Sequence, residues 1–183
     1  ETDALHLVWH PHLIQCDPKP PQHENAPWAL FEYIEGGTLR QALRRGAYSR
    51  RIALQTARDI ASALAMVHRT GMVHRDIKPE NILLRGDGAP VLADFGHLAK
   101  LRPTTREATL TNTNEAIGTA GYMAPEQREG PARAVTIDVY QMGVLLREML
   151  SGELPGPEGY QDAPNTGDAG IDRLITQMCA HDP

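Results

Sequence analysis

The sequence predicts a mainly helical α+β domain with a small sheet. Two long segments, residues 49–71 and 137–150, carry apolar residues at the spacing of amphipathic helices. Short apolar runs that suit strands lie before residue 35 and between residues 82 and 93. Because these runs are few, we expect helices to supply most of the hydrophobic core.

Length, composition and charge are those of one soluble globular domain. The chain has 183 residues, 41% hydrophobic and 22% charged. Its net charge of −5 gives no reason to expect nucleic acid or an anionic membrane as a partner. Cys16 and Cys179 lack metal-type spacing and are interpreted as reduced thiols. Since no apolar run has membrane length, we expect a cytoplasmic location, alone or as the cytoplasmic domain of a larger protein.

The start of the chain predicts two strands and a short helix. Residues 13–14 and 30–34 are apolar, and the proline-rich segment 17–27 between them has the composition of a loop. Gly36 and Gly37 then break the chain before a short helical pattern that begins near Thr38.

The middle of the chain predicts a long helix followed by a β-hairpin. Ser49 can cap the helix and Gly71 can end it. Residues 82–84 and 91–93 are joined by RGDG, whose turn chemistry favours a hairpin. The face of the helix that meets the core is expected to carry Ile52, Ile60, Leu64 and Val67.

The last part of the chain predicts two more helices separated by loops. Residues 102–114 contain almost no large apolar side chain and should form a mobile surface loop. A long helix is expected over 137–150, a loop over 155–170, and a last helical segment over 171–179. The apolar face of the long helix is expected to carry Val139, Met142, Leu146 and Met149.

Four polar residues in the middle of the chain are the candidates for chemistry. Asp76 and Lys78 follow the first long helix, and Asn81 closes the loop before the hairpin. Asp94 follows the second strand of the hairpin, so a hairpin folded back would bring all four to one rim. Phosphoryl transfer needs these types: oxygen ligands for Mg²⁺, a cation beside the transferred group and a carboxylate that accepts the proton of the attacking hydroxyl.

The motifs around these residues resemble the eukaryotic-like serine/threonine protein kinases, particularly the bacterial ones. HRDIKPEN (residues 74–81) resembles the catalytic loop, and DFG (94–96) resembles the metal-binding motif. GTAGYMAPEQ (118–127) resembles the end of the activation segment, and ALFEYIEGGTL (29–39) resembles the hinge. DVYQMGVLL (138–146) resembles the start of the central helix of the larger lobe.

The resemblance implies a protein-kinase-like fold. The chain would comprise the remnant of a β-rich N-lobe, residues 1–34, and a mostly helical C-lobe, residues 35–183. It also implies a γ-phosphate transfer from Mg·ATP to Ser or Thr of a protein substrate.

By the same resemblance, Asp76 is the catalytic base and Lys78 contacts the γ-phosphate. Asn81 and Asp94 hold Mg²⁺, and Thr119 supports Asp76 and Lys78 from the substrate side. The residues expected to bind the nucleotide are Phe31 in the gatekeeper position, Glu32, Tyr33 and Ile34 facing adenine, Leu83 beneath it, and Lys78, Glu80, Asn81 and Asp94.

Other matching residues imply structural and regulatory roles. His74 and Phe95 would be spine residues that align the lobes, and Asp138 would hold the backbone of the catalytic loop. Arg75 beside Asp76 implies activation by phosphorylation of the activation loop. Thr111 and Thr113 have the register of an autophosphorylated pair, for which two copies of the chain would meet.

The chain also departs from the family pattern. The Gly-rich loop and the strand lysine are absent, and we expect both upstream of Glu1, which has the spacing of the αC glutamate from His10. Residues 1–183 alone are therefore expected to be nearly inactive. DFGHLAK contains one residue more than the usual pattern, and residues 155–170 are too short for the usual αG helix.

Two other functions compete with protein phosphorylation. A pseudokinase or truncated module would bind partners without catalysis, but it would not need Asp76, Lys78, Asn81 and Asp94 together. A small-molecule kinase of related fold would not need the peptide-binding segment that GTAGYMAPE resembles.

Overall fold

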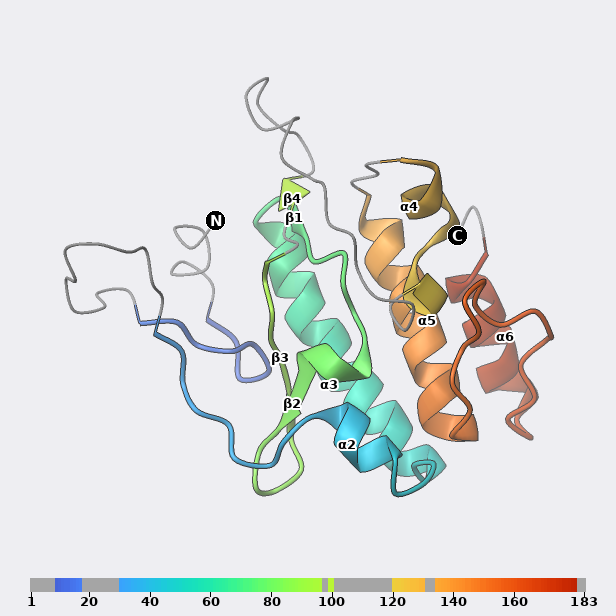
Figure 1. Ribbon diagram of the computed structural model, residues 1–183, viewed down its shortest axis with the longest axis horizontal. Coiled ribbons are helices and arrows are strands. Elements are labelled where there is room, and N and C mark those ends of the chain that lie inside the picture. Colours follow the sequence, from blue (N-terminus) through green and yellow to red (C-terminus); the bar gives the residue numbers. More distant parts are fainter. Residues whose placement is uncertain (1–8, 18–29, 97–98, 101–119, 131–133, 181–183) are drawn as a thin grey trace.

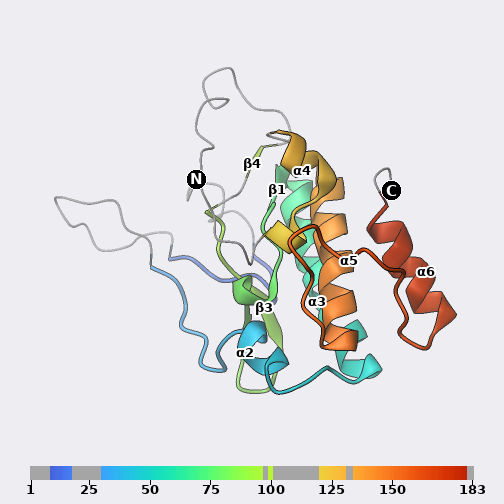
Figure 2. The ribbon, with the colours of Figure 1, turned by 45° about the vertical axis from the view of Figure 1, so that its right-hand side comes forward.

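The computed structural model describes residues 9–17, 30–96, 99–100, 120–130 and 134–180. Two long helices, α3 (Arg50–Arg69) and α5 (Val135–Ser151), run side by side through the domain (Figure 1). Helix α6 (Ala169–Met178) packs on the side of α5 opposite α3, and both ribbon views agree on this order (Figures 1 and 2). The mainly helical architecture that the sequence predicted is confirmed.

The helices begin and end at the residues whose chemistry allows it. Ser49 caps α3, accepting a hydrogen bond from the Ile52 backbone N–H at 3.4 Å, and the helix is followed by Gly71 at φ 77°. The short helix α2 (Leu39–Leu43) begins with a capping box between Thr38 and Gln41. Helices α5 and α6 each begin two residues earlier than predicted, and Asp168 caps α6.

One member of the predicted apolar face of α3 was wrong. Ile52 is 42% exposed, whereas Ile60, Leu64 and Val67 lie in the buried stripe that meets the core. Its buried members are Ala53, Thr56, Ile60, Ala63, Leu64 and Val67.

The predicted hairpin is present as the antiparallel strands β2 (Ile82–Leu84) and β3 (Pro90–Leu92). A second antiparallel pair joins β1 (Met72–Val73) to β4 (Ala99–Lys100). The strands predicted at residues 13–14 and 30–34 do not form. Within the described residues each segment makes only an isolated β-bridge, Leu13 with Leu92 and Cys16 with Phe31. A single bridge does not extend into a strand.

Short elements between the long helices complete the fold. They are two single turns of 3-10 helix, η1 (Pro79–Asn81) and η2 (Ala120–Tyr122), and the helix α4 (Pro125–Glu129). The segment from 152 to 168 contains no helix, as predicted for 155–170. None of the helices in the described part of the chain combines the length and apolar character that crossing a membrane requires.

Helix α5 is the centre of the core. Ile137, Leu145 and Met149 are fully buried, since α3 covers one side of the helix and α6 covers another. A helix buried on all sides normally carries apolar residues throughout. Helix α5 instead also buries four polar or charged side chains, Asp138, Gln141, Arg147 and Glu148, which must find partners inside the protein.

Candidate active site

Three of the four predicted chemical residues form one cluster. Lys78 forms an ion pair with Asp76, with 2.8 Å between Lys78 Nζ and Asp76 Oδ2. Asn81 Nδ2 donates to the same Oδ2 at 2.6 Å and to the Asp76 carbonyl at 2.9 Å. The cluster therefore presents a carboxylate whose orientation is fixed by a cation and an amide.

Asp94 lies at the edge of this cluster. The Ala93 N–H donates to the Asn81 carbonyl at 2.8 Å, which fastens the end of the hairpin to the end of the loop. The next residue, Asp94, has φ 60° and an exposed side chain whose Oδ1 accepts from the Gly96 N–H at 3.2 Å. The structure thus brings Asp94 to the same rim as Asn81.

Asp138 determines the path of the loop before Asp76. It is fully buried at the start of α5, and it accepts hydrogen bonds from the N–H groups of His74 at 2.9 Å and Arg75 at 2.7 Å. Its Oδ2 atom also lies 2.7 Å from His68 Nε2. The contacts of this carboxylate are those of an anchor for the loop rather than of a simple partner for the helix dipole.

His74 connects the loop to the DFG segment. Its Nε2 atom lies 3.2 Å from the Ala93 carbonyl, and its ring centroid lies 5.2 Å from that of Phe95. Burial lowers the pKa of His74 and so favours the neutral ring, although nearby carboxylates including Asp138 and Asp76 act to raise that pKa. The network assigns the proton to Nε2, because Nδ1 faces the Asp76 N–H at 3.4 Å.

The predicted hinge is fastened to the hairpin. The Gly36 N–H donates to the Leu84 carbonyl, the Leu84 N–H donates to the Gly37 carbonyl, and Thr38 forms a bridge with Leu83. A Cβ at Gly36 would lie 2.2 Å from the Leu84 carbonyl oxygen, so only glycine allows this approach. The chain after residue 34 is therefore held beside β2.

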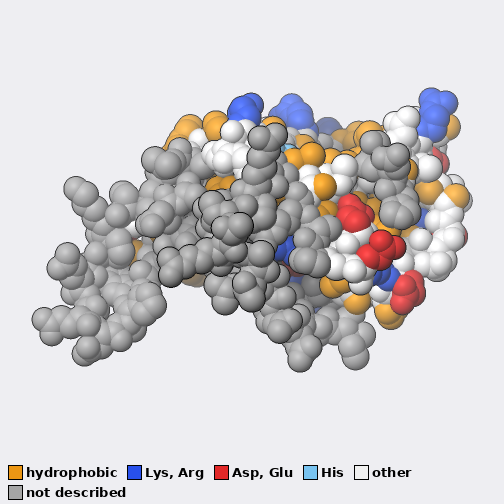
Figure 3. Space-filling model, turned by 90° about the horizontal axis from the view of Figure 1, so that it is seen from above, with side chains coloured by type: hydrophobic (Ala, Val, Ile, Leu, Met, Phe, Trp, Pro, Cys, Tyr) orange, Lys and Arg blue, Asp and Glu red, His pale blue; other side chains and the backbone are white. Residues whose placement is uncertain are grey.

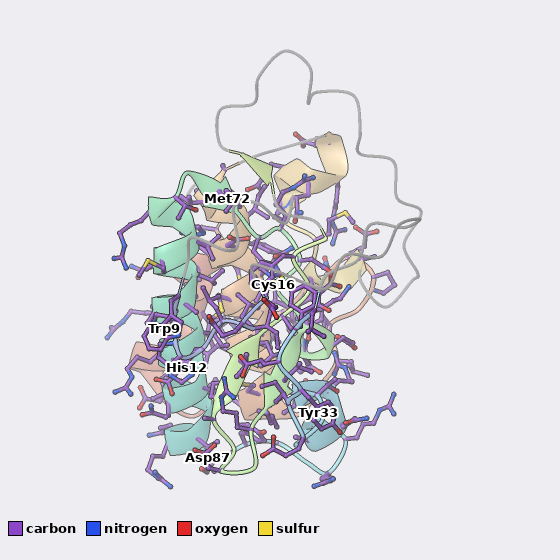
Figure 4. All side chains as sticks on the ribbon, turned by 90° about the vertical axis from the view of Figure 1, so that its left-hand side faces the viewer. Trp9, His12, Cys16, Tyr33, Met72 and Asp87 are labelled. Atoms are coloured by element: carbon purple, nitrogen blue, oxygen red, sulfur yellow. The ribbon has the colours of Figure 1, made fainter. Side chains whose placement is uncertain are left out.

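The side chains of the predicted hinge residues differ in their surroundings. Glu32 is held by Arg85, with nitrogen–oxygen distances of 3.0 and 3.1 Å, and by the Gln15 N–H at 3.0 Å. Burial acts to raise the pKa of Glu32, but these hydrogen bonds outweigh it and lower the pKa below its usual value. Ile34 is buried and Tyr33 is 86% exposed. Figure 4 looks onto the side of the molecule where Trp9, His12, Cys16 and Tyr33 are found.

Glu80 and a buried glutamate share one arginine. Arg40 of α2 contacts Glu80 at 2.6 Å and makes a short contact with Glu148 of α5. Its Nη2 atom also donates to the Tyr122 hydroxyl at 3.3 Å. Arg40 and Glu148 were not among the predicted site residues, and neither were Gln127 and Gln141. For Gln141 and Glu148 the available signal was a polar residue inside the otherwise apolar helix α5.

The oxygen atoms of the cluster fit a magnesium ion. Both N–H groups of Asn81 are directed at Asp76, so its Oδ1 atom lies on the other side of the amide. The Asp94 carboxylate is exposed, and the residue before it, Ala93, is hydrogen-bonded to the Asn81 carbonyl. Carboxylate and amide oxygens are the hard donors that Mg²⁺ takes, and these two residues could hold it.

Several predicted residues lie outside the described part of the chain. They are Glu1, Thr111, Thr113 and Thr119. Seen from above, the described part of the surface carries acidic, basic and hydrophobic side chains (Figure 3).

The fold and the site together define the class of protein. Residues 1–180 match the protein kinase domain family, and the chain belongs to that family. The N-lobe remnant and helical C-lobe that the resemblance implied agree with this membership.

The relatives of this chain are bacterial proteins named as serine/threonine-protein kinases. The chain is 45% identical over 131 residues to PknL of Mycobacterium tuberculosis, covering 70% of this chain and 32% of PknL. It is 32% identical over 194 residues to the probable kinase pknA2 of Bifidobacterium longum, covering 99% of this chain and 25% of that protein. For the probable kinase PknB of Lactococcus lactis, identity is 33% over 156 residues, covering 85% and 24%. The chain thus spans a third or less of the length of these relatives.

Proposed function

We propose that this chain carries out serine/threonine protein phosphorylation, with transfer of the γ-phosphate of Mg·ATP to a hydroxyl of a protein substrate. The observation that carries the proposal is the convergence of Asp76, Lys78 and Asn81, with Asp94 beside them. The names of the bacterial relatives support the same reaction. The proposed location is the cytoplasm.

Each member of the cluster has a proposed part in the transfer. Asp76, held by Asn81 and Lys78, orients the attacking hydroxyl and accepts its proton. Lys78 offsets the charge that spreads over the phosphoryl oxygens. Asn81 and Asp94 hold Mg²⁺, which neutralises charge on the nucleotide phosphates when bound. Thr119 is proposed to support Asp76 and Lys78.

The nucleotide is proposed to bind between the hinge and the hairpin. The adenine would lie against the hinge residues and Leu83, since the hinge is fastened to β2. The carboxylate of Glu32 is engaged by Arg85 and that of Glu80 by Arg40, so their backbone groups are the atoms available for this role. The full set is Phe31, Glu32, Tyr33, Ile34, Lys78, Glu80, Asn81, Leu83 and Asp94.

Phosphorylation of the activation loop is the proposed means of regulation. Arg75 adjoins the catalytic carboxylate in sequence, and a phosphothreonine could pair with its guanidinium. Thr111 and Thr113 are the proposed sites, and two copies of the protein would meet to modify each other.

The proposal is tested by the substitution Asp76→Asn in the natural protein that carries this chain. The amide is isosteric but cannot accept the proton, so we expect kcat to fall about 10²- to 10⁴-fold with the fold retained. Asp87→Asn, on the exposed hairpin turn, is the matched control and should keep the wild-type rate. Phosphate transfer to a protein substrate is measured with labelled ATP, and folding by circular dichroism.

Two results would count against the proposal. Normal activity of Asp76→Asn would remove the proposed base. A natural protein that binds Mg·ATP or a protein partner, yet labels no hydroxyl, would be the binding module instead.

A further inference from the structure

One amide side chain holds the backbone on both sides of Asp76. Gln141 of α5 is 2% exposed. Its Oε1 atom accepts a hydrogen bond from the Ile77 N–H at 2.8 Å, and its Nε2 atom donates to the Arg75 carbonyl at 2.9 Å. The residues before and after Asp76 are therefore attached to the same buried group.

A second glutamine joins this arrangement from α4. Gln127 Nε2 donates to the Arg75 carbonyl at 3.0 Å, and Gln127 Oε1 accepts from Gln141 Nε2 at 3.1 Å. The same Oε1 atom accepts from the Ala124 N–H at 3.0 Å. The pair of glutamines thus links the backbone at residue 124 to the backbone at residue 75.

The backbone at Arg75 needs such support. Arg75 has φ 71°, a left-handed conformation that residues other than glycine seldom adopt. Asp138 holds the Arg75 N–H, and the two glutamines hold its carbonyl. Because Asp76 follows directly, its direction depends on these bonds.

The network also fixes which way the Gln141 amide points. With the amide reversed, its NH₂ group would face the Ile77 N–H and its oxygen would face the Arg75 carbonyl. Both contacts would be repulsive. The donor and the acceptor of Gln141 therefore have separate partners, and a substitution can remove one without the other.

We propose that Gln141, together with Gln127, is a positioning residue for phosphoryl transfer. It holds Asp76 in the direction needed to accept the proton, and it links that direction to the segment 120–129. Asp76 would accept the proton directly, whereas the glutamines act only through its backbone. The inference rests on the proposed role of Asp76. Small displacements of a reacting group have large effects on rate, so the loss of these bonds affects kcat.

The first test is Gln141→Leu in the natural protein. Leucine fills similar space but cannot accept from Ile77 or donate to Arg75. We expect kcat to fall about 10- to 100-fold, with KM for Mg·ATP changed less than about twofold. In an Asp76→Asn background, Gln141→Leu should lower the remaining kcat less than about twofold, because the Asp76 carboxylate that Gln141 positions is already absent.

Gln141→Glu tests the donor alone. The ionised carboxylate can still accept from Ile77, but it places an oxygen against the Arg75 carbonyl. Protonation restores a donor, so the ratio of its kcat to that of the wild type should rise as the pH falls. If Gln141 only stabilised the fold, protonation would raise the free energy of unfolding of this variant, but its kcat, measured on folded protein, would equal that of the wild type at every pH.

Controls separate positioning from general loss of stability. Ile60→Val removes a methylene group from the core on α3 and should leave kcat unchanged. If Gln141→Leu fails to fold, Gln127→Leu replaces it, because Gln127 is half-buried and supplies one of the two donors to Arg75. Its smaller fall in kcat should also disappear in the Asp76→Asn background.

The outcomes distinguish this inference from the proposed function. An unchanged kcat in the glutamine variants, or an equal fall with and without Asp76, overturns the positioning role. A normal kcat for Asp76→Asn alone instead contradicts the proposed function, whatever the glutamine variants do.

Discussion

At the residue scale, His74 shows how burial gives a titratable group a structural role. The ring is fully buried, and its centroid lies 5.2 Å from that of Phe95. Its two nitrogens face an N–H group and a carbonyl, so only the neutral form with a proton on Nε2 satisfies both. Protonation would place a second N–H against the Asp76 N–H.

The lowered pKa of His74 predicts that the free energy of unfolding falls at acidic pH. Its folded-state pKa lies below the ordinary value of 6.5, so below that pH the unfolded chain binds a proton that the folded chain does not. The stability that the neutral ring contributes is fully present above about pH 6.5 and falls as the pH decreases, by up to about 1.4 kcal/mol per pH unit. The free energy of unfolding, measured with urea from pH 5 to 8, should follow this direction.

His74→Gln is the comparison that isolates this effect. Burial also lowers the pKa of His10, but His10 is present in both proteins and cancels in the difference. The variant should lose the part of the pH dependence that belongs to His74. An identical slope in the two proteins would show that His74 does not titrate differently on folding.

At the element scale, sequence predicted the elements whose signals are local. Helix α3 has its cap at Ser49 and its stop at Gly71, and the hairpin has its turn at residues 85–88. The strands expected at 13–14 and 30–34 were wrong, because pairing depends on a partner that local composition does not specify.

The candidate site could be predicted only in part for the same reason. The spacing of Asp76, Lys78 and Asn81 within one loop indicated their cluster. The partners that hold the loop, Gln141 and Gln127, come from distant helices. The helical pattern of the sequence indicates which side chains share a helix face. It does not indicate that Gln141 and Gln127 both donate to the Arg75 carbonyl.

Gly143 of α5 lies in close contact with the C-terminal end of α6. A Cβ at this position would lie 2.7 Å from Cys179 Sγ and 2.8 Å from Met178 Cβ. Alanine in a helix is normally about 1 kcal/mol better than glycine, but overpacking costs about 1–3 kcal/mol. We expect Gly143→Ala to lower the free energy of unfolding, as measured by chemical denaturation.

Removing part of the obstruction is the control for this prediction. Cys179→Ala in the Gly143→Ala background opens space near the new methyl group, although Met178 remains. The second substitution should then cost less than it does in the wild type. A Gly143→Ala protein more stable than the wild type would mean that α6 moves aside without cost.

At the scale of the whole molecule, Arg40 joins the site to the core. It connects α2 to Glu80 of η1, to Tyr122 of η2 and to Glu148 of α5. The Glu148 side chain is only 2% exposed. Burial raises the pKa of Glu148, and the bond to Arg40 opposes that rise. One cation therefore compensates a carboxylate that would otherwise be buried alone.

The final prediction is that this pair stabilises the whole domain in a way that a surface pair does not. Arg40→Met leaves Glu148 buried without its cation and should cost about 3–5 kcal/mol of unfolding free energy. Adding Glu148→Leu should recover much of that loss, because the unpaired carboxylate is gone. The matched control is the more exposed pair Arg50–Asp168, 3.1 Å apart, where Arg50→Met should cost far less, because solvent screens an exposed ion pair. In Arg40→Met the pKa of Glu148 rises further, so its destabilisation should be smaller at pH 5 than at pH 8. Equal costs for the two arginines, measured by urea unfolding, would mean that the Arg40–Glu148 contact is no stronger than a surface ion pair.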